Sequence, residues 1–369
     1  MTDPDYMLRA IELAKGGLGW TSPNPLVGAV IVKDGRIIGE GYHERCGKLH
    51  AERNAIASLT ESAEGATLYV TLEPCCHYGK TPPCTEAILE QKIARVVIGS
   101  RDPNPLVAGK GATILRAAGV RVEEDFMREE CDALNPVFFH YITKKTPYVV
   151  MKYAMTADGK IAARTGDSKW ITGESARKKV QELRHQYMGI MAGIGTVLAD
   201  DPMLNVRIPG LKSPVRIICD SGLRIPMDSQ LVKTAKEYRT IVAYAGEHSG
   251  EGCKEAEEKE EQLHAAGVET VSVPDADGRV GLRKLMEYLG KQGIDSVLLE
   301  GGGTLNDAAL SAGIVNEICA FIAPKIFGGA GAKTPVSGIG VAHPAEAVML
   351  TLKQMETIGD DLMLRYSVD

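Results

Sequence analysis

The stretch TLYVTLEPCCHYGKTPPC, residues 67–84, decides the fold of the first half of the chain. Its opening run is apolar and rich in β-branched residues, which predicts a buried strand over 67–72, and a helix is predicted over 83–91. Cys75 comes directly after this strand and a proline, and the positive field of a helix N-terminus lowers the pKa of a thiol placed there. With Cys84 at the expected helix start, this order indicates α/β structure that presents thiols for metal or thiol chemistry.

The segments on either side continue an alternation of helix and strand. An Asp34-Gly35 pair between two β-branched runs predicts a tight hairpin turn. The other expected elements of this half are helices near 6–15 and 50–62 and strands over 27–33, 36–42 and 95–100. Such alternation favours an α/β layer sandwich. The charged stretch 127–147 is predicted to be helical, and we place a domain boundary near Lys145.

A second α/β domain is predicted after this boundary. Its expected strands cover 148–156, 190–194, 215–221, 240–245, 268–273 and 295–300, and its expected helices cover 173–187, 252–266, 279–292 and 304–313. Two further strand-like segments, 315–324 and 362–368, have no helix between them, which favours an antiparallel edge on an otherwise parallel sheet. The glycines at 301–303 follow a strand and open a helix, a modest signal for phosphate binding. They do not form G-x-G-x-x-G, so a standard Rossmann domain is disfavoured.

Composition narrows the class of function. The 369 residues are 44% hydrophobic and 24% charged, as in folded globular proteins. A net charge of −6 and 5% aromatic residues give no reason to expect a nucleic-acid partner. The longest near-apolar run, 188–198, is too short to cross a bilayer, so no membrane partner is expected. Without an apolar signal segment or a disulfide framework, we expect a cytoplasmic protein that acts on a small molecule.

A pair of motifs carries the chemistry of the first half. His50-Ala-Glu52 stands at a predicted helix start, and with Cys75 it matches the H-x-E…P-C core of zinc nucleobase deaminases. That signature continues C-x-x-C, whereas here the next separate cysteine is Cys84. Catalytic zinc needs three protein ligands and one open position, which His50, Cys75 and Cys84 would supply, while Glu52 would shuttle protons during hydrolytic deamination.

Three alternatives stay open for these motifs. The neighbouring side chains Cys76 and His77 are rival ligands, and if one of them fills the fourth position the zinc would only hold the fold together. The third alternative is a nucleic-acid or nucleoside zinc deaminase with an unrelated appended domain. The acidic balance, the few aromatic residues and the long spacing from Cys75 to Cys84 argue against it.

Eight segments carry a more specific resemblance. They are SPNPLVGAV (22–30), HAE (50–52), TLEPCCHYGKTPPC (71–84), RDPNPLVAGKG (101–111), MKYAMTADGKIA (151–162), SKWITG (168–173), GTVLADDPMLNVR (195–207) and LLEGGGTLN (298–306). Together they resemble the bifunctional deaminase/reductase family of riboflavin biosynthesis over nearly the whole chain. In that family the second cysteine ligand lies nine positions after the first, as here. The resemblance implies a cytidine-deaminase-like three-layer α/β/α domain over 1–145 and a dihydrofolate-reductase-like α/β domain over 146–369.

For the first domain, the resemblance implies a zinc-dependent deamination of 2,5-diamino-6-(5-phosphoribosylamino)pyrimidin-4-one, a phosphorylated pyrimidine. Such a substrate needs contacts to its ring and a clamp for its phosphate. Asn24 could contact the pyrimidine edge, and Lys80, Thr81 and Asn104 could bind phosphate or ribose. Turn formation is the competing explanation for these residues, because Asn and its Gly and Pro neighbours favour turns.

For the second domain, the resemblance implies NADPH-dependent reduction of the ribosyl group to a ribityl chain. Cofactor contacts are expected at Ala154, Trp170, Thr196, Asp200, Ser221, Gly302, Gly303, Thr304 and Leu305. Substrate contacts are expected at Lys152, Ser168, Arg184, Leu204, Arg207 and Glu300. Two arginines and a lysine suit a phosphate monoester, and Lys152 and Asp200 are the candidates for orienting or protonating groups. Arg224 is considered for the cofactor's 2′-phosphate, and a homo-oligomer is expected.

Overall fold

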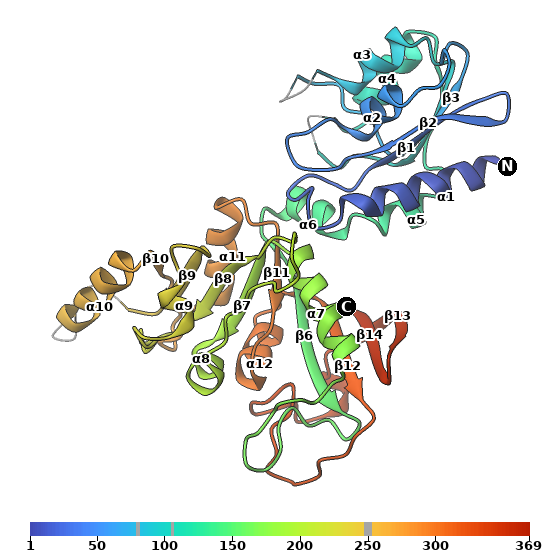
Figure 1. The fold of residues 1–369 in the computed structure, drawn as a ribbon. Helices are drawn as coiled ribbons and strands as arrows, with labels where there is room; N and C mark the ends of the chain where they lie inside the picture. The colour runs from blue at the N-terminus through green and yellow to red at the C-terminus, as the bar shows by residue number, and fades with distance from the viewer. Residues whose placement is uncertain (79–81, 105–106, 247–252) are drawn as a thin grey trace. The chain divides into compact units, whose positions relative to one another are not determined.

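The computed structural model describes residues 1–78, 82–104, 107–246 and 253–369. The chain divides into two compact units, Met1–Lys145 and Thr146–Asp369, and each is described by itself (Figure 1). A membrane-spanning helix would have to be longer and more apolar than any helix in the described residues.

A five-stranded sheet forms the middle of the first unit, in the order β2-β1-β3-β4-β5. Its strands are β1 (Gly28–Lys33), β2 (Arg36–Tyr42), β3 (Thr67–Leu72), β4 (Arg95–Ser100) and β5 (Arg121–Glu123). β1 runs antiparallel to β2 and β3, whereas β3, β4 and β5 run parallel. Asp34 and Gly35 join β1 to β2 with φ angles of 49° and 72°, as the predicted two-residue hairpin requires.

Helices cover both faces of this sheet. They are α1 (Asp3–Ala14), the short 3₁₀ helix η1 (Lys15–Gly17), α2 (Ala51–Ala57), α3 (Cys84–Glu90), α4 (Lys110–Ala117), α5 (Arg128–Asp132) and α6 (Pro136–Lys144). Val30 of β1 packs in one core with α1 and α5, while its neighbour Ile31 packs in the other with α2, α3 and α4. This alternation is the period of a strand between two helical layers, so the predicted three-layer α/β/α architecture is confirmed.

Two helices of the first unit differ from the prediction. The helix expected over 50–62 ends at Ala57, because the Ser58 hydroxyl bonds both the N–H and the carbonyl of Glu40 in β2, each at 2.8 Å. The stretch 127–147 forms two helices, α5 and α6, because Pro136 disfavours helical backbone at the residue before it. That residue, Asn135, accepts a hydrogen bond from the Leu26 N–H at 2.7 Å and donates one to the Leu26 carbonyl at 2.8 Å.

The second unit contains a nine-stranded sheet in the order β10-β9-β8-β7-β11-β6-β12-β14-β13. Its strands are β6 (Tyr148–Thr156), β7 (Gly189–Gly193), β8 (Val215–Cys219), β9 (Thr240–Tyr244), β10 (Val268–Ser272), β11 (Ser296–Leu299), β12 (Val315–Ala323), β13 (Leu350–Ile358) and β14 (Asp361–Val368). Neighbours from β10 to β12 run parallel, and β14 runs antiparallel to β12 and β13. The predicted antiparallel edge is confirmed, although β13 itself was not predicted.

Helices also cover both faces of the second sheet. They are α7 (Glu174–Gln186), α8 (Ile194–Asp200), α9 (Gln230–Lys233), α10 (Cys253–Ala265), α11 (Leu282–Lys291), α12 (Gly303–Ser311) and the 3₁₀ helix η2 (Pro344–Glu346). Ile190 of β7 packs in a core with α8, α9 and α10, and Met191 packs in a core with α11 and α12. The short helices α8 and α9 were not predicted. The architecture places loops at the carboxyl ends of the central parallel strands, where ligands bind in sheets of this kind.

Candidate functional site

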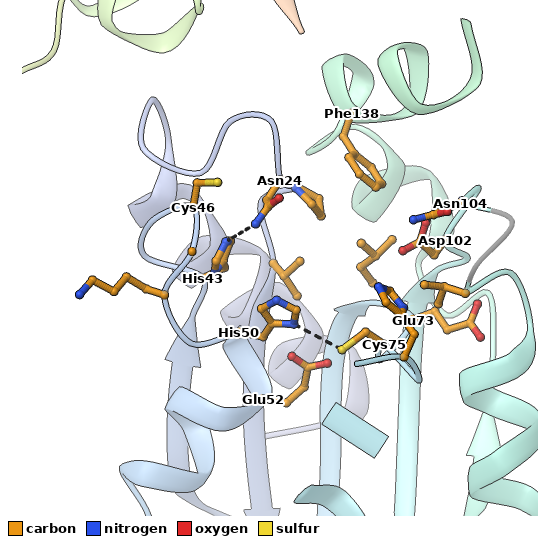
Figure 2. A pocket seen from close by; sticks show the side chains of 17 residues that line it. Asn24, His43, Cys46, His50, Glu52, Glu73, Cys75, Asp102, Asn104 and Phe138 are labelled. Carbon is orange, nitrogen blue, oxygen red and sulfur yellow. Dashed lines mark hydrogen bonds between the residues drawn. The ribbon is translucent and has the colours of Figure 1, made fainter. Parts of the chain in front are cut away.

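Three side chains of ligand type meet where β3 ends. His50 caps α2, Cys75 follows β3, and Cys84 is the first residue of α3. His50 Nδ1 lies 3.4 Å from Cys75 Sγ, a contact drawn in Figure 2. It lies 3.5 Å from Cys84 Sγ, and all three ligand atoms lie within 4.8 Å of one another. Bond lengths of about 2.0 Å for Zn–N and about 2.3 Å for Zn–S give a tetrahedron with N–S edges of about 3.5 Å. This donor set therefore fits a zinc ion.

The local electrostatics favour a thiolate at Cys75. A hydrogen bond from the Cys84 thiol lowers the pKa of Cys75 to about 4, with a further contribution from His50. The backbone N–H of Cys84, at the N-terminus of α3, also donates to Cys75 Sγ at 3.3 Å. The helix start that the sequence placed beside Cys75 thus stabilises its charged form. The same contact raises the pKa of Cys84.

Glu52 lies beside this cluster. It belongs to the first turn of α2, is 3% exposed, and points its carboxylate toward Cys75 and His50 (Figure 2). Burial raises the pKa of Glu52, and the negative charge of Cys75 raises it further. In the described part of the chain, neither Cys76 nor His77 belongs to the group of potential metal ligands. His77 is exposed and lines the neighbouring cavity instead.

A cavity of about 310 Å³ opens next to His50, Glu52 and Cys75. On one side, Asn24 Nδ2 donates to His43 Nε2 at 3.2 Å (Figure 2). His43 Nδ1 lies 2.9 Å from the Leu49 carbonyl. Since Nδ1 must donate to that carbonyl, Nε2 is the acceptor and the Asn24 amide group is held in one orientation. In this orientation the Asn24 amide oxygen is the acceptor of the amide group on this side of the cavity.

The opposite side of the cavity comes from segments that follow β4. Asp102, Asn104, Val107 and Phe138 line it. Asp102 is 9% exposed and accepts a hydrogen bond from the Asn104 N–H at 2.8 Å, while burial raises the pKa of Asp102 to about 6. Phe138 extends from α6 over the cavity (Figure 2). The expected phosphate-binding residues Lys80 and Thr81 lie outside the described residues.

Sequence reasoning missed His43, Asp102 and Phe138. Asp102 stands in the RDPNP motif two residues before Asn104, so that motif could have indicated it. His43 is an isolated histidine after a strand, and Phe138 is an apolar residue on a helix. Both have the pattern of ordinary core residues, and the sequence contains no separate signal for either.

In the second unit, three of the expected substrate residues form one buried cluster. Arg184 makes two hydrogen bonds to the Glu300 carboxylate, from Nε at 2.8 Å and from Nη2 at 3.0 Å, and Lys152 Nζ lies 3.7 Å from the same carboxylate. Their side chains are 11 to 13% exposed. Burial alone would raise the pKa of Glu300, but the two cations outweigh it and lower that pKa to about 2. Arg184 also donates to the Asn205 carbonyl at 3.1 Å, beside the buried Leu204.

Expected cofactor residues follow the carboxyl ends of three neighbouring parallel strands. Thr196 follows β7, Ser221 follows β8 and Gly302 follows β11. A Cβ placed on Gly302 would lie 3.8 Å from Thr196 Oγ1, so the starts of α8 and α12 are close together. Thr304 and Leu305 belong to the first turn of α12, which begins at Gly303. Asp200 is exposed at the last position of α8, on a different element from Lys152 of β6.

The remaining expected residues lie on the surface of the second unit or near it. Ala154 is in β6, and Ser168 and Trp170 are in the loop that follows. Trp170 is 61% exposed, with the Arg177 guanidinium 4.7 Å from its ring centre. Arg207 is exposed, and its backbone N–H donates to Gln181 of α7 at 2.9 Å.

Known proteins resemble both halves of the chain. Residues 1–100 match the family model of the cytidine and deoxycytidylate deaminase zinc-binding region, and residues 147–364 match that of the RibD C-terminal domain. The riboflavin biosynthesis protein RibD of Actinobacillus pleuropneumoniae is 59% identical over 368 residues, which cover 100% of this chain and 96% of that protein. The chain belongs to the RibD family. RibD of Escherichia coli K12 is 40% identical, with 99% of each chain covered.

Solved RibD structures share the fold over its whole length. Acinetobacter baumannii RibD superposes with a TM-score of 0.86 at 37% identity, covering 100% of this chain and 99% of that one. A Thermotoga maritima protein named as a diaminohydroxyphosphoribosylaminopyrimidine deaminase/5-amino-6-(5-phosphoribosylamino)uracil reductase also gives 0.86, at 39% identity, with 99% and 98% covered.

As a member of the RibD family, the chain is a bifunctional deaminase and reductase of riboflavin biosynthesis. Its zinc-binding deaminase domain is cytidine-deaminase-like, and its reductase domain has the dihydrofolate-reductase-like fold that the sequence resemblance implied. The matched zinc-binding region ends at residue 100. The side of the cavity formed by Asp102, Asn104 and Phe138 therefore lies outside that region.

Proposed function

We propose that the first unit deaminates 2,5-diamino-6-(5-phosphoribosylamino)pyrimidin-4-one at a zinc ion held by His50, Cys75 and Cys84. The observation that carries this proposal is the convergence of one imidazole and two sulfurs at zinc-ligand distances on a cavity that also contains Glu52. The name of the Thermotoga maritima relative, a diaminohydroxyphosphoribosylaminopyrimidine deaminase, supports the same substrate class.

Glu52 is the proposed proton carrier of this reaction. When bound, zinc supplies Lewis acidity that makes a water molecule nucleophilic near neutral pH. Glu52 would accept a proton from the attacking water on its carboxylate oxygen and pass it to the pyrimidine ring nitrogen. It would then carry a second proton, from the added hydroxyl group, to the amino group, which leaves as ammonia. Its buried position excludes competing water from this transfer, and the anchored helix α2 holds it next to His50.

The substrate contacts proposed for this site follow from the cavity. Asn24, held by His43, would accept from a ring N–H, and Asn104 would contact the ribose or phosphate. Lys80 and Thr81 remain proposed phosphate contacts on the basis of the family resemblance alone.

Two activities on one chain can be tested separately. Purified protein incubated with the diaminopyrimidine phosphate should release ammonia, and NADPH oxidation should follow. Glu52→Ala should abolish ammonia release and leave the reduction of preformed deaminated substrate unchanged. The reason is that Glu52 and the proposed zinc ligands lie in the first unit, whereas the proposed reductase residues lie in the second. Loss of both activities in this variant would refute separate sites.

We propose that the second unit reduces the ribosyl group of the deaminated product with NADPH. The parallel strands β8, β7 and β11 bring Ser221, Thr196 and Gly302–Leu305 to one edge of the sheet, where a dinucleotide can bind across strand ends. The other proposed cofactor contacts are Ala154, Trp170 and Asp200. NADPH supplies the hydride, and the protein mainly holds donor and acceptor together and excludes water.

Lys152, Arg184 and Glu300 are the proposed anchors of the substrate in this unit. The remaining proposed contacts are Ser168, Leu204 and Arg207. Because Arg184 is engaged by Glu300, Lys152 is the better placed cation to orient a sugar oxygen or deliver a proton, with Asp200 as the second proposed group. Lys152→Met should lower kcat for reduction while ammonia release is retained; unchanged reduction would exclude that role.

We propose that the protein forms a homo-oligomer through β13 in the cytoplasm. β13 is the last strand of its sheet, and its apolar side chains Leu350, Leu352 and Met355 are 38, 52 and 67% exposed. Such an edge is a template for pairing with a second copy. Sedimentation of Leu352→Lys should show a smaller species than the wild type, and no change would exclude this edge as the interface between copies.

The proposed cytoplasmic location agrees with the proposed zinc site, because a reducing compartment would keep Cys75 and Cys84 as thiols.

A further inference from the structure

We infer that Glu73 is a positioning residue of the deaminase site. Glu73 holds both ends of the loop that carries Asp102 and Asn104. The inference rests on the deaminase function proposed above and adds a residue that acts through the backbone rather than on the reacting atoms. Glu73 follows β3 directly and is 4% exposed.

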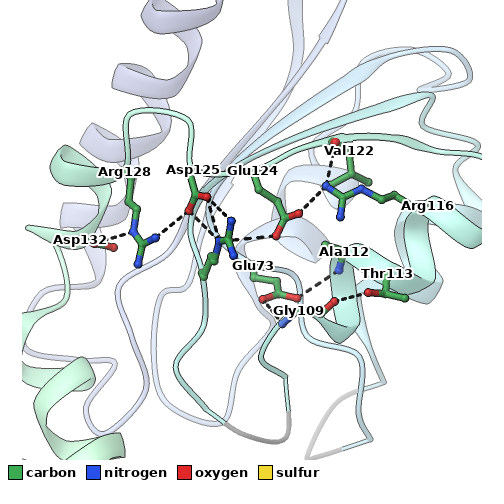
Figure 3. A network of polar contacts seen from close by, with 11 residues as sticks. Glu73, Gly109, Ala112, Thr113, Arg116, Val122, Glu124, Asp125, Arg128 and Asp132 are labelled. Carbon is green, nitrogen blue, oxygen red and sulfur yellow. Dashed lines mark hydrogen bonds and ion pairs between the residues drawn. The ribbon is translucent and has the colours of Figure 1, made fainter.

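The side chain of Glu73 binds the start of α4. Its Oε2 accepts a hydrogen bond from the Gly109 N–H at 2.9 Å, and its Oε1 accepts one from the Ala112 N–H at 3.3 Å (Figure 3). The first N–H groups of a helix have no partner within the helix, and a carboxylate there is also stabilised by the helix dipole. Both carboxylate oxygens are therefore engaged by the protein, although Glu73 lies at the wall of the cavity.

The start of α4 packs directly on the backbone beside Glu73. A Cβ added to Gly111 would lie 2.2 Å from the Pro74 carbonyl oxygen and 3.3 Å from Glu73 Oε1. Only glycine permits this approach, because real Cβ atoms do not come so close to a carbonyl. The contact lies one residue before Cys75, so the helix start is held against the segment that presents this proposed zinc ligand.

The loop between β4 and α4 is held at its other end by the same residue. The backbone N–H of Glu73 donates to the Ser100 carbonyl at 3.0 Å, where β4 ends. Among the described residues of this loop, the Asn104 carbonyl accepts from the Val107 N–H at 2.8 Å and the Val107 carbonyl accepts from the Lys110 N–H at 2.7 Å. At the β4 end the loop is also held by Arg101, whose guanidinium bonds the Asp125 carboxylate, whereas at the α4 end the Glu73 side chain bonds Gly109, two residues after Val107. The turn that joins Asn104 to Val107 therefore depends on the anchor that Glu73 supplies.

This loop supplies one side of the cavity. Asp102, Asn104 and Val107 line it opposite Asn24, while His50 and Glu52 come from α2. Loss of the Glu73 carboxylate would release the Gly109 end of the loop and leave α2 untouched. The expected consequence is weaker substrate binding with nearly normal turnover of bound substrate, because the groups that would carry out the reaction stay in place.

The test compares three variants of the full chain: Glu73→Ala, Glu73→Gln and the control Glu124→Ala. Glu124 also binds α4, through Arg116 near the end of the helix, but it has no bond to Gly109 or Ala112 (Figure 3). It lies 4.0 Å from Arg101 at the start of the loop, and Arg101 keeps its hydrogen bonds to Asp125 when Glu124 is replaced. Ammonia release from the diaminopyrimidine phosphate gives kcat and KM, and zinc content is measured for each variant. Reduction of the preformed deaminated product belongs to the other unit, so it reports the amount of chain in the assay independently of the first unit.

For Glu73→Ala we expect KM to rise about tenfold, the effect of losing a charge-assisted hydrogen bond, with kcat and zinc content changed by less than about twofold. Glu73→Gln keeps one acceptor oxygen and should restore KM in part, and Glu124→Ala should match the wild type. A merely structural role would lower the active fraction, and so the apparent kcat, without changing KM.

Three outcomes would overturn the inference: an unchanged KM in both Glu73 variants, a loss of zinc that accounts for the activity change, or an equal rise of KM in Glu124→Ala. If the wild-type chain released no ammonia, the proposed deaminase function would fail, and this inference with it. If the wild type is active and KM does not respond to Glu73, only the positioning role fails.

Discussion

Replacing Glu300 by glutamine should destabilise the second unit by about 3 kcal/mol at neutral pH. The carboxylate is 12% exposed and shares two hydrogen bonds with Arg184 and an ion pair with Lys152. Although burial opposes its charge, these cations lower its pKa from 4.5 to about 2. At about 1.4 kcal/mol per pKa unit, this difference corresponds to about 3 kcal/mol of stability. Removing one partner of a buried ion pair costs a similar amount, about 3–5 kcal/mol.

A matched control is available in the same unit. Arg239 and Glu269 form the same two-bond geometry, at 2.8 and 2.9 Å, but their side chains are 38 and 45% exposed. Glu269→Gln should therefore cost less than about 1 kcal/mol. The chain has two tryptophans, Trp20 and Trp170, so urea unfolding followed by fluorescence in a Trp20→Phe background reports the second unit alone.

The pH dependence gives a second check on the same reasoning. Because the folded-state pKa of Glu300 lies below the unfolded value, its stabilisation is complete above about pH 5 and is lost as the pH falls from 4.5 toward 2. The difference in unfolding free energy between the wild type and Glu300→Gln should shrink by about 1 kcal/mol between pH 7 and about pH 3.5. Equal costs for Glu300→Gln and Glu269→Gln at neutral pH would refute the argument.

Three further outcomes are expected. Removing the metal with a chelator should stop ammonia release and leave NADPH-dependent reduction intact; if reduction fell in parallel, the assignment of zinc to the first unit would be wrong. Asn135→Ala should destabilise the first unit by about 2 kcal/mol, since the Leu26 N–H and carbonyl would lose their partner, and Trp20 fluorescence in a Trp170→Phe background measures this. Arg216→Met should lower the unfolding free energy of the second unit by more than about 2 kcal/mol, because the fully buried guanidinium donates hydrogen bonds to the Leu231 and Tyr238 carbonyls. A variant as stable as the wild type would contradict this.

The residues of the proposed zinc site could be predicted because metal chemistry restricts their types. Few patterns place one histidine, one glutamate and two cysteines at a helix start and a strand end, and here these residues do come together. The other side of the cavity could not be predicted in this way. A phenylalanine on a helix has the same pattern whether it faces a core or a ligand, and Phe138 contributes to both.

The elements that were missed have physical reasons as well. β13 is exposed on both faces along most of its length, so the alternation that marks a half-buried strand is absent. The helix α8 is only seven residues long, shorter than the window in which a helical period can be recognised. Its first residues also follow Gly193 and contain Gly195, and glycine weakens the helical signal of so short a segment.

The position of β6 has a consequence for how the chain forms during synthesis. The first unit has every strand of its sheet once residue 123 has left the ribosome. β6 is the first strand of the second unit to emerge from the ribosome, yet it is an inner strand of its sheet. Both of its neighbours, β11 and β12, lie after residue 295 in the sequence. Parallel strands that are so distant along the chain pair slowly. The apolar surface of β6 therefore stays unpaired until most of the remaining chain has been synthesised. The first unit can be finished cotranslationally, whereas the centre of the second closes only near the end of translation.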